Sequence, residues 1–219
     1  VGKVCHYRVC EDVVLYFTPS FLLGLLTNRK KRLYFSNGIK LIFFFFFCNE
    51  RKEGEMDKGI LVTSFWTSHK DTRKKSIEVI EEAVKEKYGK ERVERAFTSG
   101  IIRKIIANKE GFHVYNQEEG LEALKNKGYS EIITMSTHVL NGTEYSKLSD
   151  RYGKITKPLL SDERDYDRIV KDEDFNALEG NDALIFMGHG SESEADRSYD
   201  ILQEKYVKDG KSNIFIATV

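Results

Sequence analysis

Short apolar runs alternate with longer charged segments along residues 57–219, and this alternation limits the fold more than any other feature of the sequence. The runs lie at residues 58–65, 92–97, 131–138, 182–190 and 212–219. Runs that stay apolar at successive positions are typical of strands covered on both faces. Strands that alternate with helices predict an α/β fold in which helices flank a parallel sheet.

Two of the intervening segments carry clear signals for the start of a helix. Thr98 or Ser99 is suited to cap a helix that begins directly after it. Asn116 and Glu119 have the spacing of a capping box, and Gly128 is placed to end the helix that they open. In the helix that begins after Ser99, we expect four residues to face the core: Ile101, Ile102, Ile105 and Ile106.

Further helices are predicted over residues 71–88, 141–153 and 163–178. A second capping box, formed by Ser191 and Glu194, predicts one more helix near the end of the chain. Residues 154–160 are expected to be extended.

Residues 1–56 have a different texture from the rest of the chain. They contain all three cysteines and five consecutive phenylalanines, 43–47. A membrane anchor does not fit, because the apolar run around these phenylalanines is too short and is broken by Lys40. An additional folded domain is a second interpretation, but the segment has little periodicity. We expect residues 1–56 to be disordered or non-native, translated from DNA upstream of Met56, since the preceding residues can be encoded by a purine-rich ribosome-binding sequence.

The last part of the sequence leaves two interpretations. Residues from 182 onward offer only two strands and one helix, which is less than a domain. The last apolar run also needs neighbouring strands on both sides. These elements either complete the first sheet or belong to a fragment of a longer protein, and we expect a fragment.

The overall charge argues against several kinds of partner. Lysine and arginine number 35, as do aspartate and glutamate, so neither nucleic acid nor a membrane surface is an expected partner. Cysteine is absent after residue 56, which excludes thiol chemistry in the organised part of the chain.

Polar residues follow three of the predicted strands. They are found from Ser64 to His69, at Thr137 and His138, and at the sequence Gly188-His189-Gly190. Ligands of parallel α/β sheets bind outside the carboxyl ends of the strands, so these positions are candidates for a binding site.

His189 has two interpretations. The flanking Gly188 and Gly190 either form a tight turn that leaves the imidazole in solvent, or they remove side-chain bulk so that a large flat ligand can approach it. A neutral imidazole is both a metal ligand and a base near neutral pH. His138 is either a second site residue or a buried histidine satisfied by the backbone.

The predicted start of a helix at Ser99 has two interpretations as well. Free backbone amides there, together with Arg103, would suit a carboxylate. A simple capped helix is the alternative.

Four segments taken in order, "GILVTSFWTSHKDTR", "RAFTSGIIRKI", "STHVLNGTEY" and "LIFMGHGS", resemble the anaerobic cobalt chelatases of cobalamin biosynthesis. These enzymes are the sirohydrochlorin cobaltochelatases, class II relatives of ferrochelatase. The resemblance covers residues 57–219 and implies a chelatase-like fold of two similar α/β lobes with the tetrapyrrole between them. On this basis we expect the first lobe to span residues 57–178 and an incomplete second lobe to begin at residue 179. It also implies a cytoplasmic lyase that uses cobalt as substrate and sirohydrochlorin as partner, without an organic cofactor, as a possible homo-oligomer.

The resemblance assigns His189 as the residue that binds the metal and takes part in proton removal. The positions expected to bind the carboxylate-rich macrocycle are Ser64, Thr67, Ser99, Arg103, His138, Glu144, Gly188 and Gly190. Two further site residues of the family, a glutamate and a histidine, would lie beyond Val219.

The sequence departs from the family pattern at Trp66, which stands where these enzymes usually have glycine. Two alternatives therefore stay open. The chain could insert iron or nickel into the same macrocycle, or it could bind a tetrapyrrole or metal without catalysis.

Overall fold

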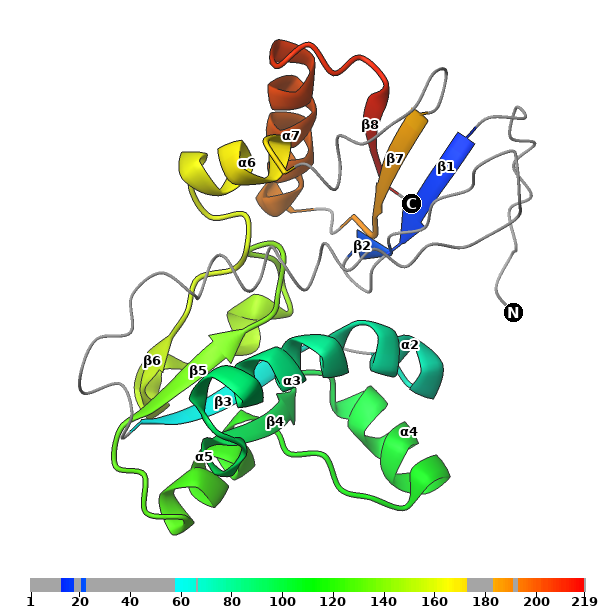
Figure 1. Ribbon diagram of the computed structural model, residues 1–219. Helices are drawn as coiled ribbons and strands as arrows, with labels where there is room; N and C mark the ends of the chain where they lie inside the picture. Colours follow the sequence, from blue (N-terminus) through cyan, green and yellow to red (C-terminus); the bar gives the residue numbers. More distant parts are fainter. Residues whose placement is uncertain are drawn as a thin grey trace.

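The structure is a computed structural model that describes residues 13–17, 21–22, 58–65, 67–172, 183–190 and 193–218. It contains two sheets, each flanked by helices (Figure 1). The prediction that residues 1–56 are non-native or disordered, and the position of Trp66, lie largely or wholly outside the described residues.

The first sheet has the strand order β4-β3-β5-β6 and is parallel throughout, as the sequence predicts. Its strands are β3 (Gly59–Ser64), β4 (Val93–Phe97), β5 (Ile132–Ser136) and β6 (Lys154–Ile155). Because all four strands run in one direction, the residues that follow β3, β4 and β5 meet at one edge of the sheet.

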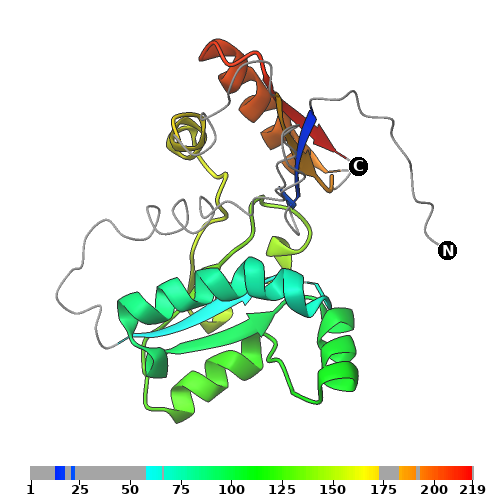
Figure 2. The same ribbon diagram turned by 45° about the vertical axis from the view of Figure 1, so that its right-hand side comes forward.

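Helices cover both faces of this sheet, and Figure 2 shows the strands between α3 above and α5 below. The helices of this part of the chain are α2 (Lys70–Lys75), α3 (Ile77–Tyr88), α4 (Gly100–Glu110) and α5 (Gln117–Asn126). Ile60 and Val62 pack with α3 and α4, whereas Leu61 packs with α5. Successive residues of β3 therefore face opposite layers, which explains why the strand is buried at every position and begins with an apolar run.

The second sheet is built around β7. Its strands are β1 (Val13–Phe17), β2 (Phe21–Leu22), β7 (Ala183–Gly188) and β8 (Ile214–Thr218). β7 is parallel to β1 and β8 and antiparallel to β2. In Figures 1 and 2, β7 ends on the side of its sheet that faces the first sheet.

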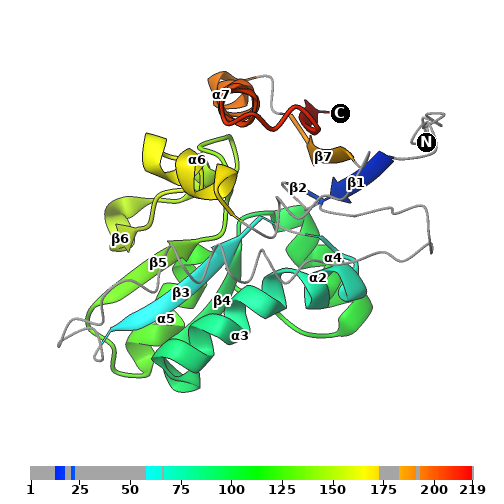
Figure 3. The same ribbon diagram turned by 45° about the horizontal axis from the view of Figure 1, so that its top comes forward.

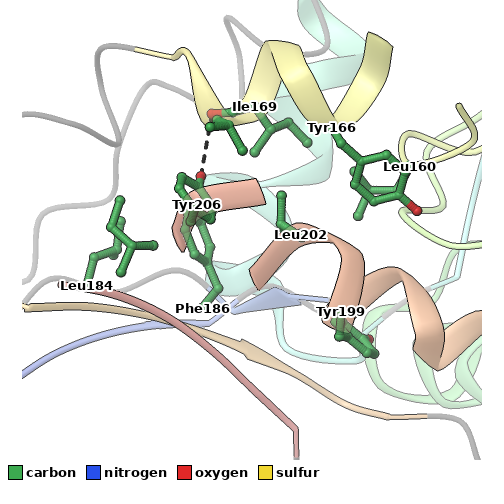
Figure 4. Close-up of a cluster of buried hydrophobic side chains, with 10 residues drawn as sticks. Leu160, Tyr166, Ile169, Leu184, Phe186, Tyr199, Leu202 and Tyr206 are labelled. Atoms are coloured by element: carbon green, nitrogen blue, oxygen red, sulfur yellow. Dashed lines mark hydrogen bonds between the residues drawn. The ribbon is translucent and has the colours of Figure 1, made fainter. Parts of the chain in front are cut away.

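Two helices, α6 (Glu163–Val170) and α7 (Arg197–Lys208), pack with the second sheet. Figure 3 shows them on the side of the molecule away from α3 and α5. Their shared core contains Phe186, whose ring stacks on Tyr206 with the centroids 5.9 Å apart, and Leu202 (Figure 4). α6 precedes residue 178 in the sequence, yet its buried side chains belong to this second core.

Three of the expected helices differ from the prediction. Residues 71–88 form two helices, because the backbone leaves the helical region at Ser76, whose hydroxyl donates to the carbonyl of Thr72. The helix expected over residues 163–178 ends at Val170, and residues 173–178 lie outside the described part. Ser191 of the second predicted capping box also lies outside it, and Ser193 caps a single 3-10 turn, Glu194–Asp196, that precedes α7.

The prediction of a helix over residues 141–153 is wrong. Two 3-10 turns, Tyr145–Lys147 and Asp150–Tyr152, are found instead. The amide of Gln117 binds both backbone groups of Ser149, accepting from its nitrogen at 2.9 Å and donating to its carbonyl oxygen at 3.1 Å. This pairing holds Ser149 extended between the two turns.

One predicted core residue of α4 is also misplaced. Ile106 is fully buried, but Ile101 is 73% exposed. The two residues are about 140° apart on a helix of 3.6 residues per turn, so one face cannot bury both of them.

Candidate functional site

The residues predicted to form the site occupy the carboxyl ends of both sheets. One group follows β3, β4 and β5 in the first sheet, and the other is the sequence Gly188-His189-Gly190 at the end of β7. Both groups lie where ligands of parallel sheets bind.

A chain of hydrogen bonds joins the three strand ends of the first sheet. Ser64 Oγ accepts from Thr137 Oγ1 at 2.8 Å, and the carbonyl of Ser64 accepts from the backbone nitrogen of Thr98 at 2.9 Å. Thr98 Oγ1 donates to Glu144 Oε2 at 2.8 Å, and Glu144 also forms an ion pair with Lys147. The Ser64 side chain is buried, so the structure ties it to the neighbouring strand rather than to solvent.

His138 lies buried beside this chain and is only 4% exposed. The Ser136 hydroxyl oxygen accepts from the His138 backbone nitrogen at 3.2 Å and lies 2.8 Å from Nδ1. Nε2 is buried and has no hydrogen-bond partner among the described residues. His138 is therefore buried, as one of its two interpretations expects, but the partner of its imidazole is the Ser136 hydroxyl and not the backbone.

The surroundings of His138 keep its imidazole neutral. Burial lowers the pKa of His138 to about 4, against an opposing effect of Glu144 and with a smaller contribution from Lys147. The ring of Tyr145 meets the imidazole edge-on, with the centroids 6.0 Å apart.

The start of α4 has the cap that the sequence predicts. Ser99 Oγ accepts from the backbone nitrogen of Ile102 at 3.4 Å. Arg103 is one turn further along and lies 3.7 Å from Glu119, measured from Nη1 to Oε2. Thr67 is half-buried, and its hydroxyl accepts from the backbone nitrogen of His69 at 3.2 Å.

At the end of β7, His189 is exposed and Gly188 is buried. The space beside Gly188 is filled by the ring of Tyr199 from α7. Gly190 has a φ of 72°, a left-handed conformation that favours glycine. Glycine is therefore favoured at these two positions for different structural reasons.

Among the residues that the structure describes, no group of three His, Cys, Asp or Glu side chains could hold a metal ion. A cavity of about 310 Å³ lies at the outer edge of β4, where Glu81, Arg95 and His113 line it, and it contains none of the predicted site residues. The part of the chain that the structure describes also contains no helix long and apolar enough to cross a membrane.

Comparison with known proteins identifies the family. Residues 58–219 match the sequence model of the family described as cobalt chelatase (CbiK). The chain belongs to the cobalt chelatase family.

Two curated relatives agree with this membership. The sirohydrochlorin cobaltochelatase of Salmonella typhimurium is 31% identical over 158 residues, which are 67% of this chain and 60% of that protein. The sirohydrochlorin cobaltochelatase CbiKC of Nitratidesulfovibrio vulgaris is 27% identical over 162 residues, 66% of this chain and 56% of that protein. The chain thus spans less than two thirds of the length of the curated relatives that it matches.

Two residues near the candidate site were not predicted from the sequence. Ser136 is one of them, although its position two residues before His138 could have indicated the contact. Tyr199 is the other, and it was not predicted because its contact with Gly188 joins two separate elements, α7 and the end of β7. The sequence indicates a helix that carries Ala195, Leu202 and Tyr206, but it does not indicate what this helix contacts.

Proposed function

We propose that this chain acts as a sirohydrochlorin cobaltochelatase, a lyase that inserts Co²⁺ into sirohydrochlorin during anaerobic cobalamin biosynthesis in the cytoplasm. The observation that carries the proposal is the exposed His189 at the carboxyl end of β7, within the region that matches the cobalt chelatase family. Both relatives are sirohydrochlorin cobaltochelatases, which supports the choice of metal and macrocycle.

The reaction exchanges two pyrrole protons of the macrocycle for one divalent cobalt ion. The ion sheds water as the nitrogen ligands replace it. A neutral imidazole suits this chemistry because its nitrogen lone pair either binds the ion or accepts a proton. We assign His189 this role.

The carboxylates of the macrocycle need donors and positive charge. Ser99 and Arg103 at the start of α4 supply both, because the first turn of a helix has free backbone amides. We assign the remaining contacts to Ser64, Thr67, His138 and the two glycines beside His189. Since Ser64, His138 and Gly188 are buried here, their contacts require a local opening of the strand ends.

Glu144 is also included in the proposed site. Its carboxylate is held by Thr98 and Lys147 at the same strand ends. We propose further that residues 57–178 form one lobe and that a second lobe begins at residue 179, with the macrocycle between them. Within this division, α6 belongs to the first lobe by sequence but packs its buried side chains in the second core.

An absorbance assay with sirohydrochlorin and Co²⁺ tests the proposed function. The chain should accelerate the spectral change of cobalt insertion, and His189→Ala should abolish the acceleration. His113→Ala is the matched control, because the His113 side chain is 60% exposed and lines the separate cavity beside β4. Binding of the macrocycle without insertion would contradict the assignment as an enzyme, and faster insertion of Fe²⁺ or Ni²⁺ would contradict the choice of cobalt.

A further inference from the structure

The ring of Tyr199 occupies the place where a side chain at residue 188 would lie. A Cβ atom added to Gly188 would be 2.5 Å from Tyr199 Cε1, 2.6 Å from Cζ and 2.7 Å from the hydroxyl oxygen. These separations are too short for any non-bonded contact. Gly188 does not have a positive φ, so its backbone conformation does not require glycine. The residue before His189 must be glycine because Tyr199 packs against it.

The same side chain reaches the residue after His189. The Tyr199 oxygen accepts a hydrogen bond from the backbone of Gly190. One phenol ring therefore contacts both neighbours of His189, while the imidazole itself stays exposed.

Tyr199 is firmly held in this position. It is 7% exposed and belongs to the second core with Leu202 and Tyr206. Figure 4 shows it projecting from α7 on the side that faces the strands. Burial raises the pKa of the Tyr199 phenol, so the hydroxyl keeps its proton while it accepts from Gly190.

We propose that Tyr199 is a positioning residue for His189: it holds the Gly188-His189-Gly190 turn in the conformation that presents the imidazole to the metal. The inference rests on the proposed function of His189. A residue that fixes a neighbouring ligand affects affinity and rate without touching the substrate, because small displacements of a reacting group are costly.

Tyr199→Phe tests the proposal, with Tyr206→Phe as the matched control. Tyr206 is a second buried tyrosine of α7, and its hydroxyl donates to the carbonyl of Ile169 at 3.4 Å, away from the turn. Tyr199→Phe should shift the NMR resonances of the His189 imidazole in the metal-free protein. It should also weaken binding of Co²⁺ alone by about 3- to 10-fold, the effect of one lost hydrogen bond. Tyr206→Phe should change neither quantity.

A second pair of variants covers the case in which single changes disturb folding. Gly188→Ala should lower the melting temperature, and Gly188→Ala combined with Tyr199→Leu should recover part of that loss because the ring is removed. The double variant should still bind Co²⁺ more weakly than the unmodified chain. Wild-type affinity in the double variant, or equal NMR shifts in Tyr199→Phe and Tyr206→Phe, would overturn the inference.

Failure of the proposed function would give a different experimental result from failure of this inference. If His189→Ala retained cobalt insertion, His189 would not be the metal-binding residue. The NMR shift in Tyr199→Phe would still report that Tyr199 positions the imidazole.

Discussion

The buried imidazole of His138 should make the chain lose stability in mild acid. Burial lowers the pKa of His138 from 6.5 to about 4 in the folded protein, whereas the unfolded chain keeps the ordinary value. Between these two pKa values, the unfolded chain therefore binds a proton at His138 that the folded protein does not bind. The stability that His138 contributes is present above pH 6.5 and is lost as the pH falls from there toward the folded pKa. Glu144 opposes this effect and Lys147 adds to it, and both are included in the value.

The size of the effect follows from the two pKa values. One unit of pKa difference corresponds to about 1.4 kcal/mol. At pH 5 the unfolded histidine is almost fully protonated and the folded one is mostly neutral. The loss of unfolding free energy relative to pH 8 is then about 2 kcal/mol, and it approaches about 3 kcal/mol below pH 4.

Urea denaturation at pH 8 and at pH 5 measures this loss. His138→Asn removes the titrating group, so its unfolding free energy should fall by about 2 kcal/mol less than that of the unmodified chain between the two pH values. Since all other groups contribute equally to both proteins, the comparison isolates His138. His113→Asn, at an exposed histidine, controls for the loss of an imidazole as such.

An equal loss of stability in His138→Asn and in the unmodified chain would refute the reasoning. It would mean that the imidazole is hydrated or paired with an acceptor in solution. An NMR titration of His138 would then show protonation close to pH 6.5 instead of near pH 4.

Three further predictions concern contacts that stabilise the fold: a core side chain, a buried ion pair and a helix cap. Leu202→Ala should cost about 2–5 kcal/mol of unfolding free energy in urea, because the side chain is 2% exposed, whereas Val207→Ala, at a residue that is 60% exposed, should cost less than about 0.5 kcal/mol. Glu81→Gln should cost about 2 kcal/mol of unfolding free energy in the same assay, since it weakens the ion pair that the buried carboxylate forms with Arg95. A stabilised variant would show that the free-energy cost of burying the charge is larger than the gain from the ion pair. Asn116→Ala removes the capping box of α5 and should cost about 1 kcal/mol, measured by thermal denaturation; an unchanged melting temperature would count against the cap.

Much of the fold could be predicted because it depends on local patterns. Strands covered on both faces are apolar at every position, so the run that becomes β3 stands out in the sequence. Helix caps use residues three apart in the chain, and both Asn116 with Glu119 and the cap at Ser99 are confirmed. The parallel direction of the strands follows from the helices between them.

Other features depend on contacts between distant segments. Ser149 is extended because Gln117, 32 residues earlier, binds its backbone. Ile101 is the same residue type as the buried Ile106 and lies in the same helix, but α4 packs a different face against the sheet. The location of the polar strand ends was foreseeable, whereas their connection through Thr98 and Glu144 was not.

The sequence by itself determined that a histidine between two glycines ends an apolar strand of an α/β fold. It could not determine why the first glycine is there, because a glycine leaves space for a ligand and for a neighbouring side chain alike. Only the tertiary structure decided that question for Gly188, by placing the Tyr199 ring against it. The physical reason is that two atoms cannot share one volume, and which atom fills it depends on how α7 packs on β7.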